Sequence, residues 1–287
     1  MLTKRVRSIK NSITRPNELL NRAYIWKLSG FKPKNVILFE NKKYIVKTVE
    51  TVLELEKALN LRYEVYYREL INKSSIIKLD IDRYDLISDH IVIVEKCTKE
   101  VIGTYRVISS TFSDCYYSES EFNIDKIKNV PVNKLELGRA CVHRNYRNGL
   151  TLAMLWKGVS LYIDSLNIRY LFGCSSVNTT NILEISLIYK FIRDMHLSGE
   201  DLRVYPKDKF RVIDIANYLD AFEKFSAKAE NIEDFIPPLL KAYLKAGSKI
   251  CGEPALDRKF RCADFFTVLD TDLMSDKFEK RYKAVNA

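Results

Sequence analysis

A strand that passes through a glycine-containing turn directly into a helix is the feature that most constrains the fold of this chain. Residues 134–143 (KLELGRACVH) have the apolar content of a strand. From Gly149 to Leu166 apolar residues, among them Met154 and Val159, recur at helical spacing. Residues 168–175 (IRYLFGCS) then predict another strand. This order indicates a mixed layer of helices and strands.

The segments on either side alternate between helical and strand periodicity. Thr51 is a plausible N-cap for a helix that we expect to reach Leu70. Residues 111–130 are expected to form a mobile polar connection. The order of segments predicts an α/β fold with a mixed α+β sheet, and not an alternating doubly wound sheet. The other predicted elements are strands at 35–49, 90–95, 100–108 and 263–269 and a helix at about 181–195.

The charge balance indicates an acidic partner. The 287 residues carry a net charge of +10, which suits nucleic acid, an anionic membrane surface or an acidic protein; a basic surface kept for solubility is the alternative. The first 34 residues hold nine lysines and arginines against one acid, Glu18. We expect residues 1–34 to form a basic arm, either on an anionic bilayer or packed on the protein, and residues 35–287 to form one domain.

Several signals are missing from the sequence. It has no run of about 18 apolar residues and no secretory signal at its start, so we expect a cytoplasmic location. The six cysteines lack CxxC spacing, so we predict neither a zinc site nor a disulfide framework, and no metal. Nucleic acid is disfavoured as a partner because the basic residues match no helix-turn-helix, zinc-finger or stacking-platform pattern.

Two charged residues interrupt the strand at 134–143. Glu136 and Arg139 are costly to bury unless they are paired or used. Strict alternation sends them to opposite faces, whereas a bulge at Gly138 would turn both toward one cleft and expose an N–H for an acyl carbonyl oxygen. A purely structural ion pair between them fits the pattern equally well.

The turn after this strand is a candidate anion site, because unpaired N–H groups and the helix dipole favour an anion at a helix start. We predict that a phosphopantetheine phosphate or a pyrophosphate lies on the first amides of the helix. An ordinary structural turn gives the same pattern. His143 beside it is a candidate for proton movement, although a lone histidine is more often structural. The candidate phosphate-binding residues are Arg144, Arg147, Asn148, Gly149 and Leu150.

The same stretch resembles a known family. LELGRACVHRNYRNG (135–149) is similar to the core motif of the ornithine lipid synthesis N-acyltransferases, which belong to the GNAT superfamily and use acyl carrier protein. The similarity covers most of the chain from about Leu61 onward. It implies a GNAT-like fold with extra N- and C-terminal helices. It continues in RYLFGCSSV (169–177), PPLLKAYLKAGSKICGEPALDRKF (237–260) and ADFFTVLDTDLMSDKFEKRY (263–282).

A more distant resemblance is to the acyl-homoserine-lactone synthases. Their pattern is an arginine in the first helix, acids before a strand, Gly-x-x-Arg in the next strand, and then Glu-x-x-Arg. The aromatic positions of that family are matched only by tyrosines near residue 65, so lactone formation is not expected. The matching residues here are Arg62, Asp82 or Asp85, Gly103 to Arg106, and Glu136 with Arg139.

These resemblances imply amide formation. An acyl thioester on the phosphopantetheine arm of acyl carrier protein, or of acyl-CoA, would be attacked by the amine of an amino acid such as ornithine to give a lyso-aminolipid. A long-chain, 3-hydroxy acyl group is implied, with no permanently bound cofactor. Glu136 would orient the amine or accept its proton, and Arg106 or Arg139 would bind the substrate carboxylate. The expected acceptor-binding residues are Arg62, Asp85, Arg106 and His143.

The basic charge suits this interpretation, because acyl carrier proteins are acidic and a lipid product belongs in an anionic membrane. We therefore expect a peripheral location on the inner face of the cytoplasmic membrane. Two alternatives stay open. One is a related acyltransferase with glycine, lysine, a lysophospholipid or a homoserine-lactone type of acceptor. The other is a non-catalytic GNAT-like module that binds membrane or carrier protein.

Overall fold

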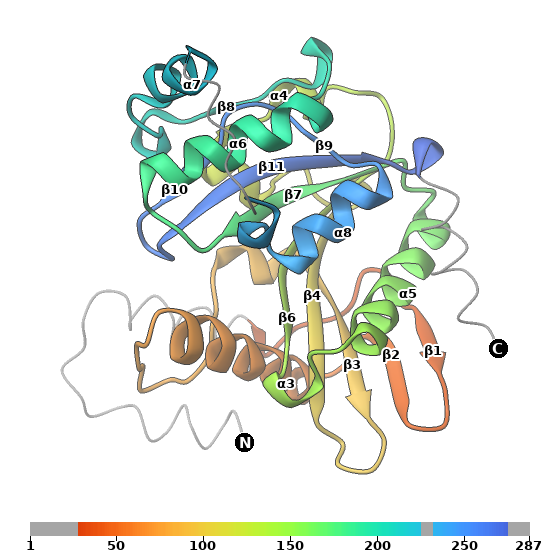
Figure 1. Ribbon diagram of the computed structural model, residues 1–287. Helices are drawn as coiled ribbons and strands as arrows, with labels where there is room; N and C mark the ends of the chain where they lie inside the picture. The colour runs from red at the N-terminus through yellow and green to blue at the C-terminus, as the bar shows by residue number, and fades with distance from the viewer. Residues whose placement is uncertain (1–27, 225–231, 275–287) are drawn as a thin grey trace. The chain divides into compact units, whose positions relative to one another are not determined.

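A computed structural model describes residues 28–224 and 232–274 (Figure 1). Most of the basic arm predicted for residues 1–34 lies outside the described residues. The described chain divides into two compact units. Unit 1 holds residues 28–113 and Leu137–Asn167, and unit 2 holds Asp114–Glu136 and the described residues from Ile168 onward. The single domain expected over 35–287 remains a prediction.

Unit 1 is built on a sheet whose strand order is β1-β2-β3-β4-β6. The strands predicted at 90–95 and 100–108 are confirmed as β3 and β4, which pair antiparallel. β2 pairs antiparallel with both β1 and β3. Every residue of β4 is buried. The strands are β1 (Leu38–Glu40), β2 (Tyr44–Thr48), β3 (Asp89–Glu95), β4 (Val101–Ser109) and β6 (Lys134–Val142), of which unit 1 holds the part from Leu137.

The first helix of unit 1, α3 (Val52–Arg62), begins at the predicted cap. The Thr51 side chain accepts the Glu54 N–H, and the Glu54 side chain accepts the Thr51 N–H, which is a complete capping box. Residues Tyr63–Leu70 continue the helix in the wider π form as η2. The predicted helix to Leu70 is therefore present, with a change of winding that its apolar periodicity did not indicate.

The second helix of unit 1, α5 (Gly149–Leu166), matches the predicted helix residue for residue. A Cβ on its Gly158 would lie 2.7 Å from an Ile91 side-chain carbon, so the helix approaches β3 closely there. Val92, the next residue of β3, belongs to the core cluster of Leu55 and Leu59 from α3. Because successive strand residues face opposite sides of a sheet, α3 and α5 cover opposite faces.

Unit 2 is centred on two long strands, β7 (Tyr170–Val177) and β11 (Cys262–Asp270), which pair antiparallel along eight residues. β7 also pairs in parallel with Lys134–Glu136 at the start of β6. Apolar residues of the helices α6, α7 and α8 form the core with these strands. The other elements of this core are α6 (Ile182–His196), α7 (Ile215–Lys224), α8 (Pro238–Ala246), β9 (Lys249–Ile250) and β10 (Ala255–Asp257).

The mobile connection expected at 111–130 is wrong. This stretch forms short elements whose apolar side chains Phe122, Ile124 and Ile127 are buried at 0–1% exposure. Isolated apolar residues in a polar sequence gave too weak a periodicity for prediction. The short elements of unit 2 are η4 (Tyr117–Ser120), β5 (Phe122–Asn123), α4 (Asp125–Lys128), η6 (Glu200–Leu202), β8 (Tyr205–Pro206), η7 (Asp208–Phe210), η8 (Ile232–Phe235) and η9 (Thr271–Leu273). Unit 1 adds η3 (Arg83–Leu86) and η5 (Arg144–Tyr146).

Candidate functional site

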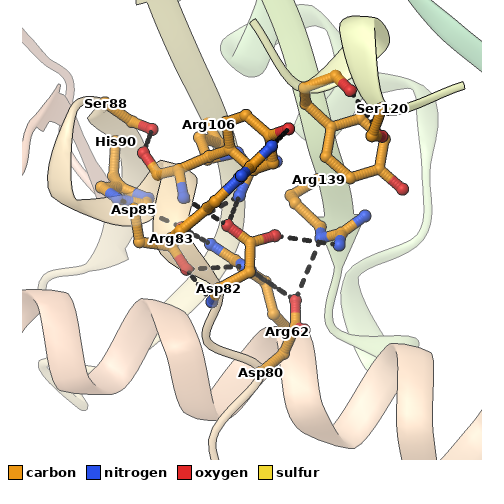
Figure 2. A network of polar contacts seen from close by, with 12 residues as sticks. Arg62, Asp80, Asp82, Arg83, Asp85, Ser88, His90, Arg106, Ser120 and Arg139 are labelled. Carbon is orange, nitrogen blue, oxygen red and sulfur yellow. Dashed lines mark hydrogen bonds and ion pairs between the residues drawn. The ribbon is translucent and has the colours of Figure 1, made fainter. Parts of the chain in front are cut away.

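Three arginines and three aspartates form one buried network in unit 1, which we call the Arg–Asp network (Figure 2). The arginines come from three different elements: the end of α3, the middle of β4 and the centre of β6. The aspartates come from the segment around η3 that precedes β3. The formal charges cancel. The members are Arg62, Arg106, Arg139, Asp80, Asp82 and Asp85.

Arg62 is at the inner end of this network, with 0% exposure. Its Nε donates to Asp80 at 2.8 Å, while its two terminal nitrogens donate to the two oxygens of Asp85 at 2.7 and 3.3 Å. This bidentate geometry is the strong form of an arginine–carboxylate pair. Arg62 and Asp85 therefore form the strongest pair of the network, and each also binds other members of it.

The outer end of the network is formed by Asp82 and Arg139. Arg106 donates to Asp82 at 2.7 Å and to Asp85 at 3.2 Å. Arg139 donates to Asp82 at 3.1 Å and lies 3.3 Å from an oxygen of Asp80. The side chains of Asp82 and Arg139 are 24% and 11% exposed, against 2% or less for Arg62 and Arg106. A polar ligand would meet the network at Asp82 and Arg139.

The network keeps Asp80 and Asp82 ionised. Burial by itself would raise the pKa of Asp82, but the guanidinium groups of Arg106, Arg139 and Arg62 outweigh burial and hold this pKa well below its usual range. Burial opposes ionisation of Asp80 in the same way, and Arg62 and Arg139 lower its pKa. At neutral pH the outer edge of the network thus presents a carboxylate beside a guanidinium.

His90 lies against this network without carrying charge. Its Nε2 is 3.8 Å from Asp85, and neither ring nitrogen forms a hydrogen bond. Burial, followed by the nearby charges of Arg62 and Arg106, lowers its pKa well below the usual value. The imidazole is therefore neutral, and its approach to Asp85 is not an ion pair.

Glu136 occupies a separate polar centre in unit 2. Its Oε2 accepts the backbone N–H of Tyr117 at 2.7 Å. Its Oε1 accepts both the N–H and the hydroxyl of Ser118, at 2.7 and 2.6 Å. The side chain is 3% exposed. Three short hydrogen bonds from the η4 turn fix this carboxylate in one orientation.

A bulge was expected at Gly138, but the unusual backbone conformation is at the next residue, Arg139. Gly138 has an ordinary backbone, whereas Arg139 has a φ of 49°, in the left-handed region. A non-glycine residue adopts this conformation only where its surroundings hold it there. The ion pairs of Arg139 with Asp80 and Asp82 do so. Glu136 belongs to unit 2 and Arg139 to unit 1, and the cleft that we expected them to share remains a prediction.

The predicted phosphate-binding turn opens α5 as expected. The Asn148 side chain accepts the Thr151 N–H at 3.0 Å and caps the helix. Arg147 is bound to Glu69 at 2.6 Å and to the Val142 carbonyl at 3.1 Å. Arg144, Gly149 and Leu150 are exposed. The turn therefore presents the Gly149 and Leu150 amides at a helix N-terminus, and binding of an anion there remains a prediction.

His143 directly follows β6 and takes part in local structure. Its Nδ1 accepts the Asn145 N–H at 3.3 Å, and its ring meets the ring of Tyr146 edge-on at 5.6 Å. These contacts shape the short η5 turn before α5. A role of His143 in substrate binding remains a prediction.

Sequence reasoning missed three residues of these two centres. Asp80 bridges Arg62 and Arg139, yet only Asp82 and Asp85 match the acids of the distant family pattern. Tyr117 and Ser118 lie in the stretch expected to be mobile. A signal for Asp80 existed, since the acids in LDIDRYD alternate with buried Leu79 and Ile81.

A further group of buried acids lies in unit 2, and we call it the β10–β11 acidic cluster. Burial and the neighbouring carboxyl of Asp264 raise the pKa of Glu121 to about 9, against an opposing effect of Tyr117. Burial also raises the pKa of Asp264 itself. The cluster consists of Glu121, Asp257, Cys262 and Asp264.

Among the described residues, no helix combines the length and the apolar character that crossing a bilayer requires.

Known proteins are similar to this chain over part or most of its length. Residues 61–157 match the family of the acetyltransferase (GNAT) domain. An L-ornithine N(alpha)-acyltransferase of Rhodobacter capsulatus is 28% identical over 83% of this chain and 94% of that protein. One of Brucella abortus is 27% identical, over 80% and 85%. A solved CoA-dependent acyl-homoserine lactone synthase is 13% identical over 81% of this chain and 82% of that chain, with a TM-score of 0.44.

Proposed function

Because this chain is an acyltransferase with a GNAT-like fold, homologous to L-ornithine N(alpha)-acyltransferases, we propose that it joins a long-chain 3-hydroxyacyl group to the amine of ornithine. The donor is the acyl thioester of acyl carrier protein, and the product is a lyso-aminolipid. The observation that carries this proposal is the outer edge of the Arg–Asp network, where one ionised carboxylate and one guanidinium are presented side by side.

This edge suits a free amino acid. The acceptor brings a carboxylate and an ammonium group, so it needs a cation and an anion at close spacing. Arg139 and Asp82 pair with one another at 3.1 Å, and the acceptor would compete with this pair, its carboxylate for the guanidinium and its ammonium group for the Asp82 oxygens. Arg62, Asp85 and Arg106 act behind them, since Arg106 binds Asp82 directly and is itself bound to Asp85, the partner of Arg62.

The reaction needs an unprotonated amine. The amine nitrogen attacks the thioester carbonyl carbon, the carbon–sulfur bond breaks, and the pantetheine sulfur leaves as a thiolate. A thiol has a pKa of about 8.5, so this leaving group needs little acid assistance. The proton lost from the nitrogen needs an acceptor, and we assign this role to Glu136, directly or through one water. Its three hydrogen bonds to η4 hold it in one position for the transfer.

The start of α5 supports the donor side of the proposal. Amides of Gly149 and Leu150 at the N-terminus of an 18-residue helix favour the pantetheine phosphate. Arg144 is exposed in the same turn and adds positive charge. The net charge of +10 favours an acidic carrier protein and a peripheral position on the inner face of the cytoplasmic membrane.

The test offers purified protein a 3-hydroxyacyl carrier protein together with ornithine, lysine, glycine or homoserine, and measures amide products by mass spectrometry. The proposal predicts product with ornithine and a lower rate with the other acceptors. Acyl-CoA in place of the carrier protein separates the two donors, and we expect the carrier protein to give the higher kcat/KM. If only another amino acid gave a product, amide formation would still hold, but ornithine as the acceptor would be refuted.

A further inference from the structure

The β10–β11 acidic cluster has the arrangement of a metal site. Asp257 ends β10 and faces Cys262 at the start of β11 across the hairpin. Asp264 follows two residues later in the same strand, so its side chain lies on the same face as that of Cys262. A ligand atom of each of these three residues lies within 4.8 Å of the others. All three residues are 3–5% exposed.

A fourth side chain enters the cluster from a different element. Glu121 follows η4, is 1% exposed, and turns its carboxyl group toward that of Asp264. Its polar neighbours include the side chains of Asp264 and Tyr117, but neither of its oxygens accepts a hydrogen bond of normal geometry. A buried carboxyl group in this position forfeits the solvation of both oxygens, which is costly unless another group compensates for it.

In the described parts of the chain, the acids of the cluster have no positively charged side chain as a partner. Across residues 28–224 and 232–274, no lysine, arginine or histidine forms an ion pair with Glu121, Asp257 or Asp264. Hydrogen bonds explain part of the arrangement, because Asp257 accepts the Lys259 and Phe260 N–H groups at 2.6 and 3.1 Å. These bonds shape the hairpin turn. Asp264 accepts the Ser176 hydroxyl and, weakly, the Cys262 thiol at 3.7 and 3.8 Å. The carboxyl groups of Asp257 and Asp264 and the thiol of Cys262 thus lie together.

We propose that Glu121, Asp257, Cys262 and Asp264 bind a divalent metal ion, with zinc the best match. Zinc takes one thiolate and carboxylate oxygens in a four-coordinate site, at about 2.3 Å to sulfur and about 2.0–2.2 Å to oxygen. A thiolate ligand disfavours magnesium and calcium, which bind through oxygen. The cysteine spacing predicted no metal, because three of the four ligands are acids and one comes from a distant segment.

Such an ion would have a structural role in unit 2. It would tie the β10–β11 hairpin to Glu121, directly after the η4 turn. The amides of that turn hold Glu136, so the ion would stiffen the support of that carboxylate. The inference rests on the cluster alone and does not depend on the proposed function.

The first test is direct metal binding by the full-length protein. Chelator-treated protein is loaded with Zn²⁺ or Co²⁺, passed through gel filtration and analysed for bound metal. We expect one ion per chain, and with Co²⁺ a sulfur-to-metal charge-transfer absorption in the near ultraviolet. Cys262→Ser should abolish this absorption. Cys251→Ser, a change at another buried cysteine of unit 2 outside the cluster, should retain it.

The second test is thermal unfolding with and without Zn²⁺, because a ligand bound only by the folded state raises Tm. Wild-type protein should gain several degrees, and Asp264→Asn should lose this gain while remaining folded by circular dichroism. Asp272→Asn, at an exposed acid of unit 2, should keep it. Wild-type protein that retains no metal and gains no stability would overturn the proposal, and Glu121 and Asp264 would then share a proton instead. The proposal would also be overturned if Cys262→Ser and Asp264→Asn bound as much metal as wild-type protein.

Discussion

Replacing Ser118 by alanine tests whether the position of Glu136 matters for the reaction. The Ser118 hydroxyl donates to Glu136 Oε1 at 2.6 Å, and the substitution removes this bond while the backbone N–H groups of Tyr117 and Ser118 still donate. The same hydroxyl accepts a weak hydrogen bond from Cys174 at 3.5 Å, which is also lost. The substitution therefore removes one hydroxyl donor to Glu136 together with the weak bond from Cys174.

The magnitude follows from the type of bond. A hydrogen bond to a charged group contributes about 1.5–3 kcal/mol. Two donors to Glu136 remain, so we expect the lower part of that range, about 1.5–2 kcal/mol. Since about 1.4 kcal/mol corresponds to a factor of ten in rate, kcat/KM for amide formation should fall roughly 10- to 30-fold.

A matched control lies two residues away. The Ser120 hydroxyl donates to the Tyr117 carbonyl at 2.7 Å, in the same η4 turn, and has no bond to Glu136. Ser120→Ala removes the same atom from the same turn, and its kcat/KM should stay within about twofold of wild type. Initial rates of amide formation from 3-hydroxyacyl carrier protein and ornithine measure both variants. Equal rates for Ser118→Ala and Ser120→Ala would refute the role given to Glu136.

Three further predictions concern unit 1. Arg62→Met leaves buried aspartates without their partner and should lower the free energy of unfolding by about 3–5 kcal/mol. The control Arg169→Met, at a half-exposed ion pair of unit 2, should lower it by less than about 1 kcal/mol. Urea unfolding measures both variants. Gly158→Ala places a Cβ 2.7 and 2.8 Å from neighbouring side chains and should lower the free energy of unfolding by about 1–3 kcal/mol. The Cβ of Gly138→Ala meets nothing within 4 Å, so this variant should be tolerated. Thermal melting curves compare the two. Because the pKa of Asp82 is lowered in the folded protein, this residue contributes stability above its pKa in the unfolded chain, about 3.9, and the contribution is lost as pH falls toward the folded pKa. Asp82→Asn should therefore make stability depend less steeply on pH in the acid range.

The sequence predicted the regular elements well. The hairpin of β3 and β4, the cap at Thr51 and the whole of α5 were recovered, because each carries a local signal: strand periodicity, a capping residue, and a glycine before an amphipathic run. The charged residues Glu136 and Arg139 were singled out because ionised groups within an apolar strand need partners.

Local sequence patterns did not predict which groups bind Glu136 and Arg139. Glu136 is held by backbone amides of a turn, and the residue type does not indicate that a backbone amide will serve as a partner. Arg139 adopts a left-handed backbone next to a glycine that does not, since its ion pairs with Asp80 and Asp82 fix it there. Long-range contacts of this kind depend on how distant segments pack, which single-sequence periodicity does not contain.

The central claim is that this chain forms an amide bond between an acyl thioester and an amino acid. The most direct measurement incubates the protein with 3-hydroxyacyl carrier protein and ¹⁵N-labelled ornithine and identifies the products by mass spectrometry. The account predicts one product that contains both the acyl chain and the labelled amino acid, with its rate strongly reduced in Glu136→Ala. Release of free fatty acid alone, or a rate unchanged in Glu136→Ala, would contradict it.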